Sequence, residues 1–482
     1  MNERSESSPG KWPVFALVAV GIFMSTLDGS IVNIALPNIM ADFATDMTRI
    51  RWVVIAYLLA VSSLLLSFGR LSDIVGRRPV YLFGLVIFTA GSFSCGMAGS
   101  TFLLAAGRVF QAVGAAMILA CKPALIVDVF PVSERGKSMG MVGMVVALGL
   151  TMGPYLGGLI LTHFSWRMIF YVNVPVGILA ILATLAILRR ETGRLVKESF
   201  DFAGAVLLTG SFAGFLMLLA SVADLRHAAY APAAAGLFGV CGALLVMVLK
   251  RRRHPILDPG LFKIRLFSAS IAAAVAVFTG LACVTFLMPF FLVNPAGFSE
   301  KTAGEILVAP FLFLFVIAPF SGAASDRMGS RILSTSGLVI MSLALVSLAL
   351  LKPAAGKLDI LIRLSFVGVG MAVFSSPNSA AAMTAVPMKS RGVAAATIAT
   401  ARNLGMVTGV ALASALFNAR FSTLTGHDFA VYGKALEGPF MKAFSFAMLA
   451  GALMAALGAL ASSVRGTESA RENEADRGGD LS

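Results

Sequence analysis

Gly69-Arg70-Leu71-Ser72-Asp73-Ile74-Val75-Gly76-Arg77-Arg78 separates two long apolar stretches, and a second version of this decapeptide follows 253 positions later. The second version reads Gly322-Ala323-Ala324-Ser325-Asp326-Arg327-Met328-Gly329-Ser330-Arg331. Both glycines, the serine, the aspartate and the final arginine recur at the same spacing. A charged, glycine-punctuated segment that returns half a chain later predicts a protein built from two related halves.

The composition around these segments is that of a membrane protein. The 482-residue chain is 58% hydrophobic and only 13% charged, with a mean hydropathy of +0.88. A soluble protein carries roughly a quarter charged residues, because it must cover its surface with polar groups. Runs of about 20 apolar residues, the length that crosses a hydrocarbon layer, recur along the chain. We therefore expect an all-α polytopic membrane protein.

Charged residues and Pro/Gly breaks divide the apolar sequence into fourteen expected transmembrane helices. They cover residues 12–38, 50–68, 80–99, 102–127, 137–162, 167–188, 201–222, 229–249, 266–293, 302–323, 331–351, 357–379, 392–420 and 440–463. With a cytoplasmic N-terminus, nineteen basic residues fall in inner loops and nine in outer segments. This bias is typical of the positive-inside rule, so both termini are expected in the cytoplasm.

Further repeated segments align helices one to six with helices nine to fourteen. The segment 131–136 corresponds to 387–392, and Leu148-Gly149 with Gly153 corresponds to Leu404-Gly405 with Gly409, both 256 positions later. The expected organisation is a tail at 1–11, a six-helix half at 12–188, a two-helix insert with basic flanking loops at 189–265, a second six-helix half at 266–463 and a polar tail at 464–482. Two related halves around a midplane site are typical of secondary transporters.

Other function classes find little support in the sequence. The net charge of +14 is scattered over short loops, which disfavours nucleic-acid binding. The run Lys250-Arg251-Arg252-Arg253 is instead expected to contact anionic membrane lipids. The four cysteines lie in apolar runs without CxxC spacing, the histidines form no HExxH pattern, and there is no P-loop string. We expect no enzymatic activity, no metal and no cofactor.

Asp28 is an ionisable residue inside the first expected helix, about 14 Å from its outer end by helical rise. Gly21, Ser25 and Val32 share its face, so Asp28 is expected to face small neighbours and not lipid. Loss of water favours the neutral form of a carboxyl group, so one interpretation is proton exchange at Asp28. The other is a permanently ion-paired or helix-packing aspartate.

Arg108, in the fourth expected helix, is the candidate partner of Asp28. Gln111 and Lys122 lie on the same stripe of that helix, and a polar stripe faces a wet cavity or a polar partner because lipid does not tolerate it. Arg108 is interpreted either as a charge relay with Asp28 or as a fixed structural arginine. Lys122 lies nearer the inner end, where it can instead extend to the head-group region.

Three further groups complete the candidate sites. The expected inner gate consists of Gly69, Arg70, Asp73, Gly76, Arg77, Arg78, Asp326 and Arg331, the alternative being a plain solvated loop. The expected hinge or close helix contact consists of Gly149, Gly153, Pro154, Gly157 and Gly158, the alternative being ordinary packing. The expected substrate cavity consists of Asn33, Gln111, Lys122, Tyr155, Phe286 and Phe374, the alternative for the phenylalanines being packing or lipid contact.

The chain resembles the fourteen-span drug:proton antiporters of the major facilitator superfamily. The motifs that carry the resemblance are Leu27–Pro37, Gly69–Arg78, Arg108–Gly114, Gly149–Gly158 and Trp166–Pro175. The resemblance implies proton coupling at Asp28, proton relay at Arg108, and gating by Asp73 with Arg77. It also suggests an adaptor and an outer-membrane channel as partners.

The chain departs from that family pattern in three places. Ala112 replaces the glycine usual after Gln111, and the second copy of the decapeptide has Ala323 and Ser330 in place of Arg70 and Arg77. No acidic residue lies inside the twelfth or thirteenth helix, where some relatives that export dications have one, and Arg402 and Asn403 stand in the thirteenth helix instead. We expect a bacterial inner-membrane exporter of amphipathic small molecules, driven by the proton gradient through alternating access. The alternative is a dedicated exporter or permease of one metabolite or antibiotic on the same fold.

Overall fold

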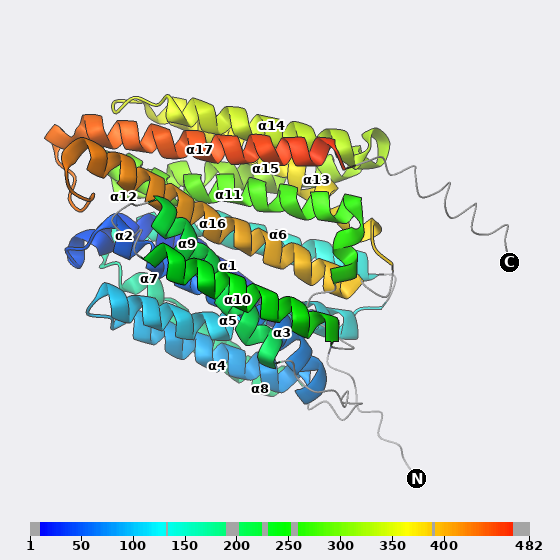
Figure 1. Cartoon of the computed structure of the whole chain (residues 1–482). Coiled ribbons are helices and arrows are strands. Elements are labelled where there is room, and N and C mark those ends of the chain that lie inside the picture. The colour runs from blue at the N-terminus through cyan, green and yellow to red at the C-terminus, as the bar shows by residue number, and fades with distance from the viewer. Residues whose placement is uncertain are drawn as a thin grey trace, which may run out of the picture. The chain divides into compact units, whose positions relative to one another are not determined.

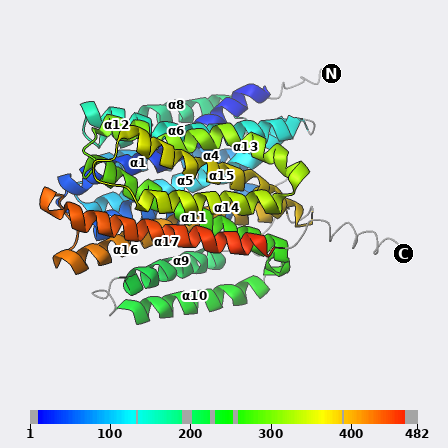
Figure 2. The ribbon, with the colours of Figure 1, turned by 90° about the horizontal axis from the view of Figure 1, so that it is seen from above.

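The computed structural model describes residues 10–131, 134–188, 202–223, 230–251, 259–387 and 391–465. These residues form an all-helical protein whose long helices run alongside one another within each of its two units (Figures 1 and 2). The α-helices are α1 (Lys11–Asp42), α2 (Met47–Ile50), α3 (Trp52–Val75), α4 (Arg77–Gly96), α5 (Thr101–Val129), α6 (Arg135–His163), α7 (Met168–Tyr171), α8 (Asn173–Ile187), α9 (Phe202–Ala223), α10 (Ala231–Arg251), α11 (Arg265–Val293), α12 (Glu300–Leu307), α13 (Ala309–Met328), α14 (Ser330–Ala349), α15 (Lys357–Thr384), α16 (Arg391–Thr425) and α17 (Glu437–Ser463).

Thirteen helices within the described residues are long and apolar enough to cross a membrane. This confirms a polytopic membrane protein. In α9 the apolar part found within the described residues is the shorter segment Val206–Phe215. The fourteenth span and the two-helix insert therefore stay predictions.

The Gly69 decapeptide is not the loop expected from the sequence. Helix α3 continues to Val75, and α4 begins at Arg77, so Gly76 alone separates them, with φ of 104°. The copy repeats this geometry, because Gly329, with φ of 79°, alone separates α13 from α14. The predicted ends at residues 68 and 323 were too early, because charged side chains mark the end of an apolar run and not the end of a helix. Only glycine adopts such positive φ values without strain.

The chain divides into two compact units. The first contains residues up to Phe212 together with Phe298–Val308, and the second contains Ala213–Gly297 and the residues from Ala309 onward. The dividing point lies inside α9. The short helix α12 packs in the first unit, where Gly304 lies against the backbone of Pro154 on α6.

The duplication is visible in the packing inside each unit. On α4 and α5, a Cβ added to Gly84 would lie 3.1 Å from the carbonyl oxygen of Gly114, and one added to Gly114 would lie 2.5 Å from the oxygen of Gly84. On α14 and α15, Gly337 and Gly370 make the same reciprocal contact at 2.7 and 2.8 Å. Each glycine pair lets two helix backbones come into contact, so the same close helix–helix contact occurs in both units.

A second repeated contact joins α1 to α6 in the first unit and α11 to α16 in the second. In the first unit, the Ser30 hydroxyl on α1 donates to the carbonyl oxygen of Gly149 on α6 at 3.1 Å. In the second, the Thr279 hydroxyl on α11 donates to the carbonyl oxygen of Gly405 on α16 at 3.2 Å. The repeated motifs of the sequence thus correspond to repeated helix–helix contacts.

Candidate functional site

The first unit contains a buried ion pair between Asp28 on α1 and Arg108 on α5. Nη1 of Arg108 donates to Oδ2 of Asp28 at 2.5 Å, and the two side chains are 1% and 0% exposed. Taking two charges out of water is expensive, and their attraction offsets that only when the remaining polar atoms are also satisfied. The surrounding hydrogen bonds are therefore part of the site.

Gln111 and Asn173 complete the contacts of the Asp28 carboxylate. Nε2 of Gln111 donates to Oδ1 of Asp28 at 2.8 Å, and Nδ2 of Asn173, at the start of α8, donates to the same oxygen at 3.2 Å. Oε1 of Gln111 accepts from Nη1 of Arg108 at 2.6 Å, while Nε2 also donates to the Ser92 hydroxyl on α4 at 2.7 Å. Both carboxylate oxygens are thus held by three side chains from two other helices.

Arg108 is fixed by α3 as well. Its Nε donates to the carbonyl oxygen of Val53 at 3.3 Å, and its guanidinium carbon lies 3.9 Å from the ring centre of Tyr57. The Tyr57 hydroxyl donates to the carbonyl oxygen of Ser25, which returns the network to α1. A guanidinium over an aromatic face gains cation–π attraction, worth about 2 kcal/mol when desolvated.

Small residues allow the helices to come close enough for this network. A Cβ on Gly91 of α4 would lie 2.5 Å from Cα of Gln111, so α4 touches α5 at the site itself. On α6, added Cβ atoms at Gly149 and Gly153 would lie 2.1 Å from Thr26 Oγ1 and 1.8 Å from Ser30 Oγ. The α6 glycines therefore press against the α1 turns on either side of Asp28.

The rest of the glycine-bearing helix makes contacts of the same kind. Gly157 lies against Ile34 of α1, and Gly158 against the backbone of Glu300 on α12. Pro154 lies inside α6, which continues through it. The structure thus shows the close helix contact, while a hinge motion at this stretch stays a prediction.

The inner-gate residues are only partly described. Nη2 of Arg78 donates to the carbonyl oxygen of Leu185 on α8 at 3.3 Å, Arg77 also has an interaction partner, and Arg331 is exposed. The side chains of Arg70, Asp73 and Asp326 lie outside the described part of the structure. Gating by this segment stays a prediction.

The residues expected in a substrate cavity lie in different surroundings, and only Gln111 belongs to the Asp28 network. Asn33 is half-buried, with no hydrogen bond to its Oδ1 within the described residues. Tyr155 is 40% exposed. Lys122 lies about 21 Å along α5 from Arg108, at 1.5 Å per residue. Cavity lining by these residues stays a prediction.

The two phenylalanines proposed for that cavity are buried between helices. The Phe286 ring on α11 lies 5.8 Å from the Phe290 ring. Phe374 on α15 lies where α14 comes closest, since a Cβ on Gly337 would lie 2.6 Å from its backbone nitrogen. These contacts correspond to the packing alternative. A role of these residues toward substrate stays a prediction.

Sequence reasoning did not assign four residues that the structure places at the network: Asn173, Tyr57, Ser92 and Val53. Asn173 lies in the quoted Trp166–Pro175 segment, and an amide between apolar residues at a helix start was the signal that could have identified it. Tyr57 and Ser92 carry no such signal, because tyrosine and serine are ordinary residues in membrane helices.

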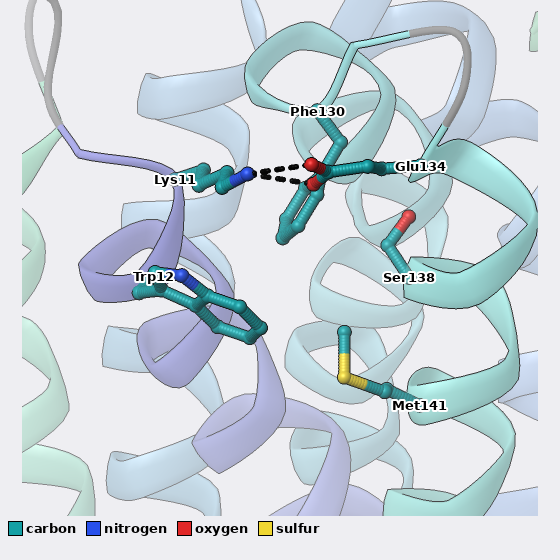
Figure 3. A pocket seen from close by; sticks show the side chains of 6 residues that line it. All are labelled: Lys11, Trp12, Phe130, Glu134, Ser138 and Met141. Carbon is teal, nitrogen blue, oxygen red and sulfur yellow. Dashed lines mark hydrogen bonds and ion pairs between the residues drawn. The ribbon is translucent and has the colours of Figure 1, made fainter.

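A second ion pair was also not expected from the sequence. Nζ of Lys11 donates to both carboxylate oxygens of Glu134 at 2.9 and 2.7 Å, beside Trp12 and Phe130 (Figure 3). The pair is about one-third exposed and borders a small pocket of about 140 Å³. It ties the start of α1 to the segment between α5 and α6.

Comparison with known proteins places this chain in a family. The Major Facilitator Superfamily profile matches residues 18–410. The chain is 36% identical over 411 residues to the riboflavin transporter RibZ of Clostridioides difficile, covering 84% of this chain and 88% of RibZ. It is 31% identical over 412 residues to the multidrug resistance protein Stp of Mycobacterium tuberculosis, covering 85% and 76%.

The fold comparison agrees. The solved structure of a bacterial homolog of the human lysosomal transporter Spinster, inward-facing and unoccupied, matches with a TM-score of 0.68 over 95% of this chain and 97% of that one. At 16% identity, this likeness shows the fold alone. The chain belongs to the Major Facilitator Superfamily of membrane transporters.

Proposed function

We propose that this protein is a proton-coupled exporter of amphipathic small molecules, of the fourteen-span drug:proton antiporter type. The observation that carries the proposal is the buried Asp28 carboxylate, held by Arg108, Gln111 and Asn173 inside a membrane helix. An ionisable group at that depth, fully satisfied by side chains of other helices, is expensive to maintain and points to a functional role. Relatives of this chain include one named a multidrug transporter and two named multidrug resistance proteins.

In the proposed cycle, Asp28 alternates between two partners, the Arg108 guanidinium and a proton. The closed network stabilises the charged carboxylate, because three side chains donate to it. Movement of α5 against α1 would separate the pair and favour protonation of Asp28. A proton bound from the outer side would then be released inward as substrate leaves the cell.

The remaining parts of the proposal follow from the sequence. Helix α9 would be the fourteenth span, α9 with α10 would form the insert, and both termini would lie in the cytoplasm of a bacterial cell with the protein in the inner membrane. Gly76 and Gly329 would be the turn points of the inner gate. The family resemblance adds an adaptor and an outer-membrane channel as partners.

A dedicated exporter or permease of one metabolite is the second candidate. The observation that favours it is the 36% identity to a protein named a riboflavin transporter, above the 31% to the protein named for multidrug resistance. Growth of a host expressing this chain on a panel of toxic compounds separates the two. Broad protection supports multidrug export, whereas a change confined to one compound supports the dedicated transporter.

Uptake of ethidium or norfloxacin into everted vesicles, where an exporter carries its substrate inward, tests the coupling when it is measured with and without a protonophore. Asp28→Asn should abolish protonophore-sensitive transport at unchanged protein level. Asp42→Asn is the matched control, because Asp42 lies at the end of the same helix and pairs with Arg167 where its side chain is 45% exposed. Full transport by the Asp28 variant contradicts the proposal, and so does protonophore-insensitive transport by the unaltered protein.

A further inference from the structure

A small pocket lies at the start of α1, away from the Asp28 network. Its volume is about 140 Å³, and its walls come from α1, the end of α5 and the start of α6. Lys11 and Asp28 are both on α1, about 26 Å apart by helical rise. Side chains of α1 face those of α6 across the pocket (Figure 3). The lining residues are Lys11, Trp12, Phe130, Glu134, Ser138 and Met141.

The pocket already holds a primary ammonium group. Nζ of Lys11 donates to both carboxylate oxygens of Glu134 at 2.9 and 2.7 Å, and it lies 5.8 Å from the ring centre of Phe130. The rings of Trp12 and Phe130 meet edge to face, with their centres 5.9 Å apart. A carboxylate beside aromatic rings is the chemistry that binds an alkylammonium cation. Lys11 is therefore an internal ligand, and it shows which chemical group the pocket accepts.

The ammonium group of Lys11 can be exchanged for another one. The side chains of Lys11 and Glu134 are 34% and 39% exposed, so both are open to solvent. A partly exposed ion pair adds little to the stability of a fold, because water competes for both charges. A second ammonium that replaces Lys11 leaves the Glu134 carboxylate paired and releases Lys11 into water. The exchange therefore leaves no buried charge without a partner.

An exposed apolar stripe of α6 continues from the pocket. Met144 and Leu148 follow Met141 on the same face of the helix, and each of the two is 50% exposed. Leu148 lies about 10 Å along α6 from Met141. A pocket for a whole drug-sized molecule has a volume of roughly 300 to 1,000 Å³, so the pocket at Lys11 has room for a head group only. The apolar body of such a ligand would lie along Met144 and Leu148.

We propose that this pocket binds the ammonium head group of an amphipathic amine, with Glu134 as the counter-charge and Trp12 and Phe130 as aromatic walls. Lys11 is the internal competitor, which fills the site until an amine displaces it. The proposal goes beyond the proposed export function, because it assigns a second site that needs no proton coupling. Phosphatidylethanolamine carries the same head group as a free amphipathic amine, so the experiment separates these two sources.

Equilibrium binding tests the inference without relying on transport. The full-length chain in dodecyl maltoside, a detergent without charge, is titrated with dansylcadaverine, a dye that carries a primary amine on a five-carbon chain, and fluorescence anisotropy is measured. Glu134→Gln should weaken dansylcadaverine binding by at least about tenfold, the loss expected for charge-assisted hydrogen bonds. Lys11→Ala should instead tighten it about two- to fivefold, because the internal competitor is removed. Dansylamide, which has the same rings and no ammonium, should not distinguish the variants.

Two further variants complete the design. Asp359→Asn is the matched control, because Asp359 is an acid of similar exposure that pairs with Arg363 in the second unit, and it should bind dansylcadaverine as the unaltered chain does. Trp12→Leu keeps the inference falsifiable if Glu134→Gln misfolds. Trp12 is 52% exposed, so its replacement should leave thermal stability unchanged, yet loss of the aromatic wall should weaken dansylcadaverine binding several-fold.

Equal dansylcadaverine binding by the unaltered and Glu134→Gln chains contradicts the proposal, and so does weaker binding by Lys11→Ala. Absence of binding to both the unaltered chain and Lys11→Ala also overturns it. Where the site binds dansylcadaverine, phosphatidylethanolamine is added to the micelles. Displacement of the dye assigns the site to a lipid head group, and no displacement assigns it to free amphipathic amines; either result upholds the ammonium site. Failure of this binding test leaves the proton-coupling proposal standing, because that proposal is decided by transport in Asp28→Asn.

Discussion

Arg108→Met tests whether Asp28 and Arg108 form one energetic unit. The substitution keeps the bulk of the side chain, but it leaves the Asp28 carboxylate 0% exposed and without its 2.5 Å donor. Breaking a buried ion pair from one side costs about 3–5 kcal/mol, because the remaining charge stays desolvated. Gln111 and Asn173 still donate to Oδ1, so we expect the lower end, about 3 kcal/mol.

The double variant Asp28→Asn/Arg108→Met removes both charges and should recover most of that loss. A neutral amide beside methionine leaves no buried charge, so the combined destabilisation should be about 2 kcal/mol or more below the sum of the single variants. The free energy of unfolding is measured by denaturant titration of the purified chain in detergent. Norfloxacin efflux should stay absent from the double variant although its stability returns. Additive single-variant losses would refute the reasoning, because they would mean that the two side chains do not compensate each other.

Four further substitutions test particular contacts. Asn173→Leu should reduce proton-coupled efflux per folded protein molecule, because it deletes one of three donors to Asp28. Efflux per molecule in proteoliposomes equal to that of the unaltered chain would contradict this. Gly114→Ala should destabilise the first unit by several kcal/mol, measured by thermal unfolding, because the added Cβ would lie 2.3 Å from the Phe88 nitrogen. Gly76→Ala should cost about 1–3 kcal/mol on the same measurement, because φ is 104° there. Lys11→Met should cost less than about 1 kcal/mol, because its ion pair is about one-third exposed.

The sequence predicted the helices well because hydrocarbon length and charge placement constrain them strongly. The expected range 266–293 differs from α11 by one residue, and each of the thirteen spans that the structure supports overlaps one expected range. The predicted helix ends at the repeated decapeptides were wrong, because a helix continues beyond the hydrocarbon layer until a residue such as Gly76 turns the backbone. Apolar pattern alone carries no information about that turn.

The charged pair of the site could be predicted from the sequence, but the neutral side chains around the pair could not. A carboxylate and a guanidinium inside apolar helices have few possible partners, so Asp28 and Arg108 could be matched from the sequence. Asn173 and Tyr57 reach the pair only through the packing of α8 and α3, and that packing depends on tertiary contacts such as Gly91 against Gln111.

Substrate-driven proton flux is the most direct test of Asp28 as the coupling residue. The purified chain is reconstituted in liposomes containing the pH-sensitive dye pyranine, and norfloxacin is added outside without a pH gradient. The unaltered chain should move protons out as norfloxacin enters, giving an internal alkalinisation. Asp28→Asn should give no pH change while still exchanging norfloxacin for norfloxacin across the membrane. A proton flux of unaltered size in Asp28→Asn would contradict the account.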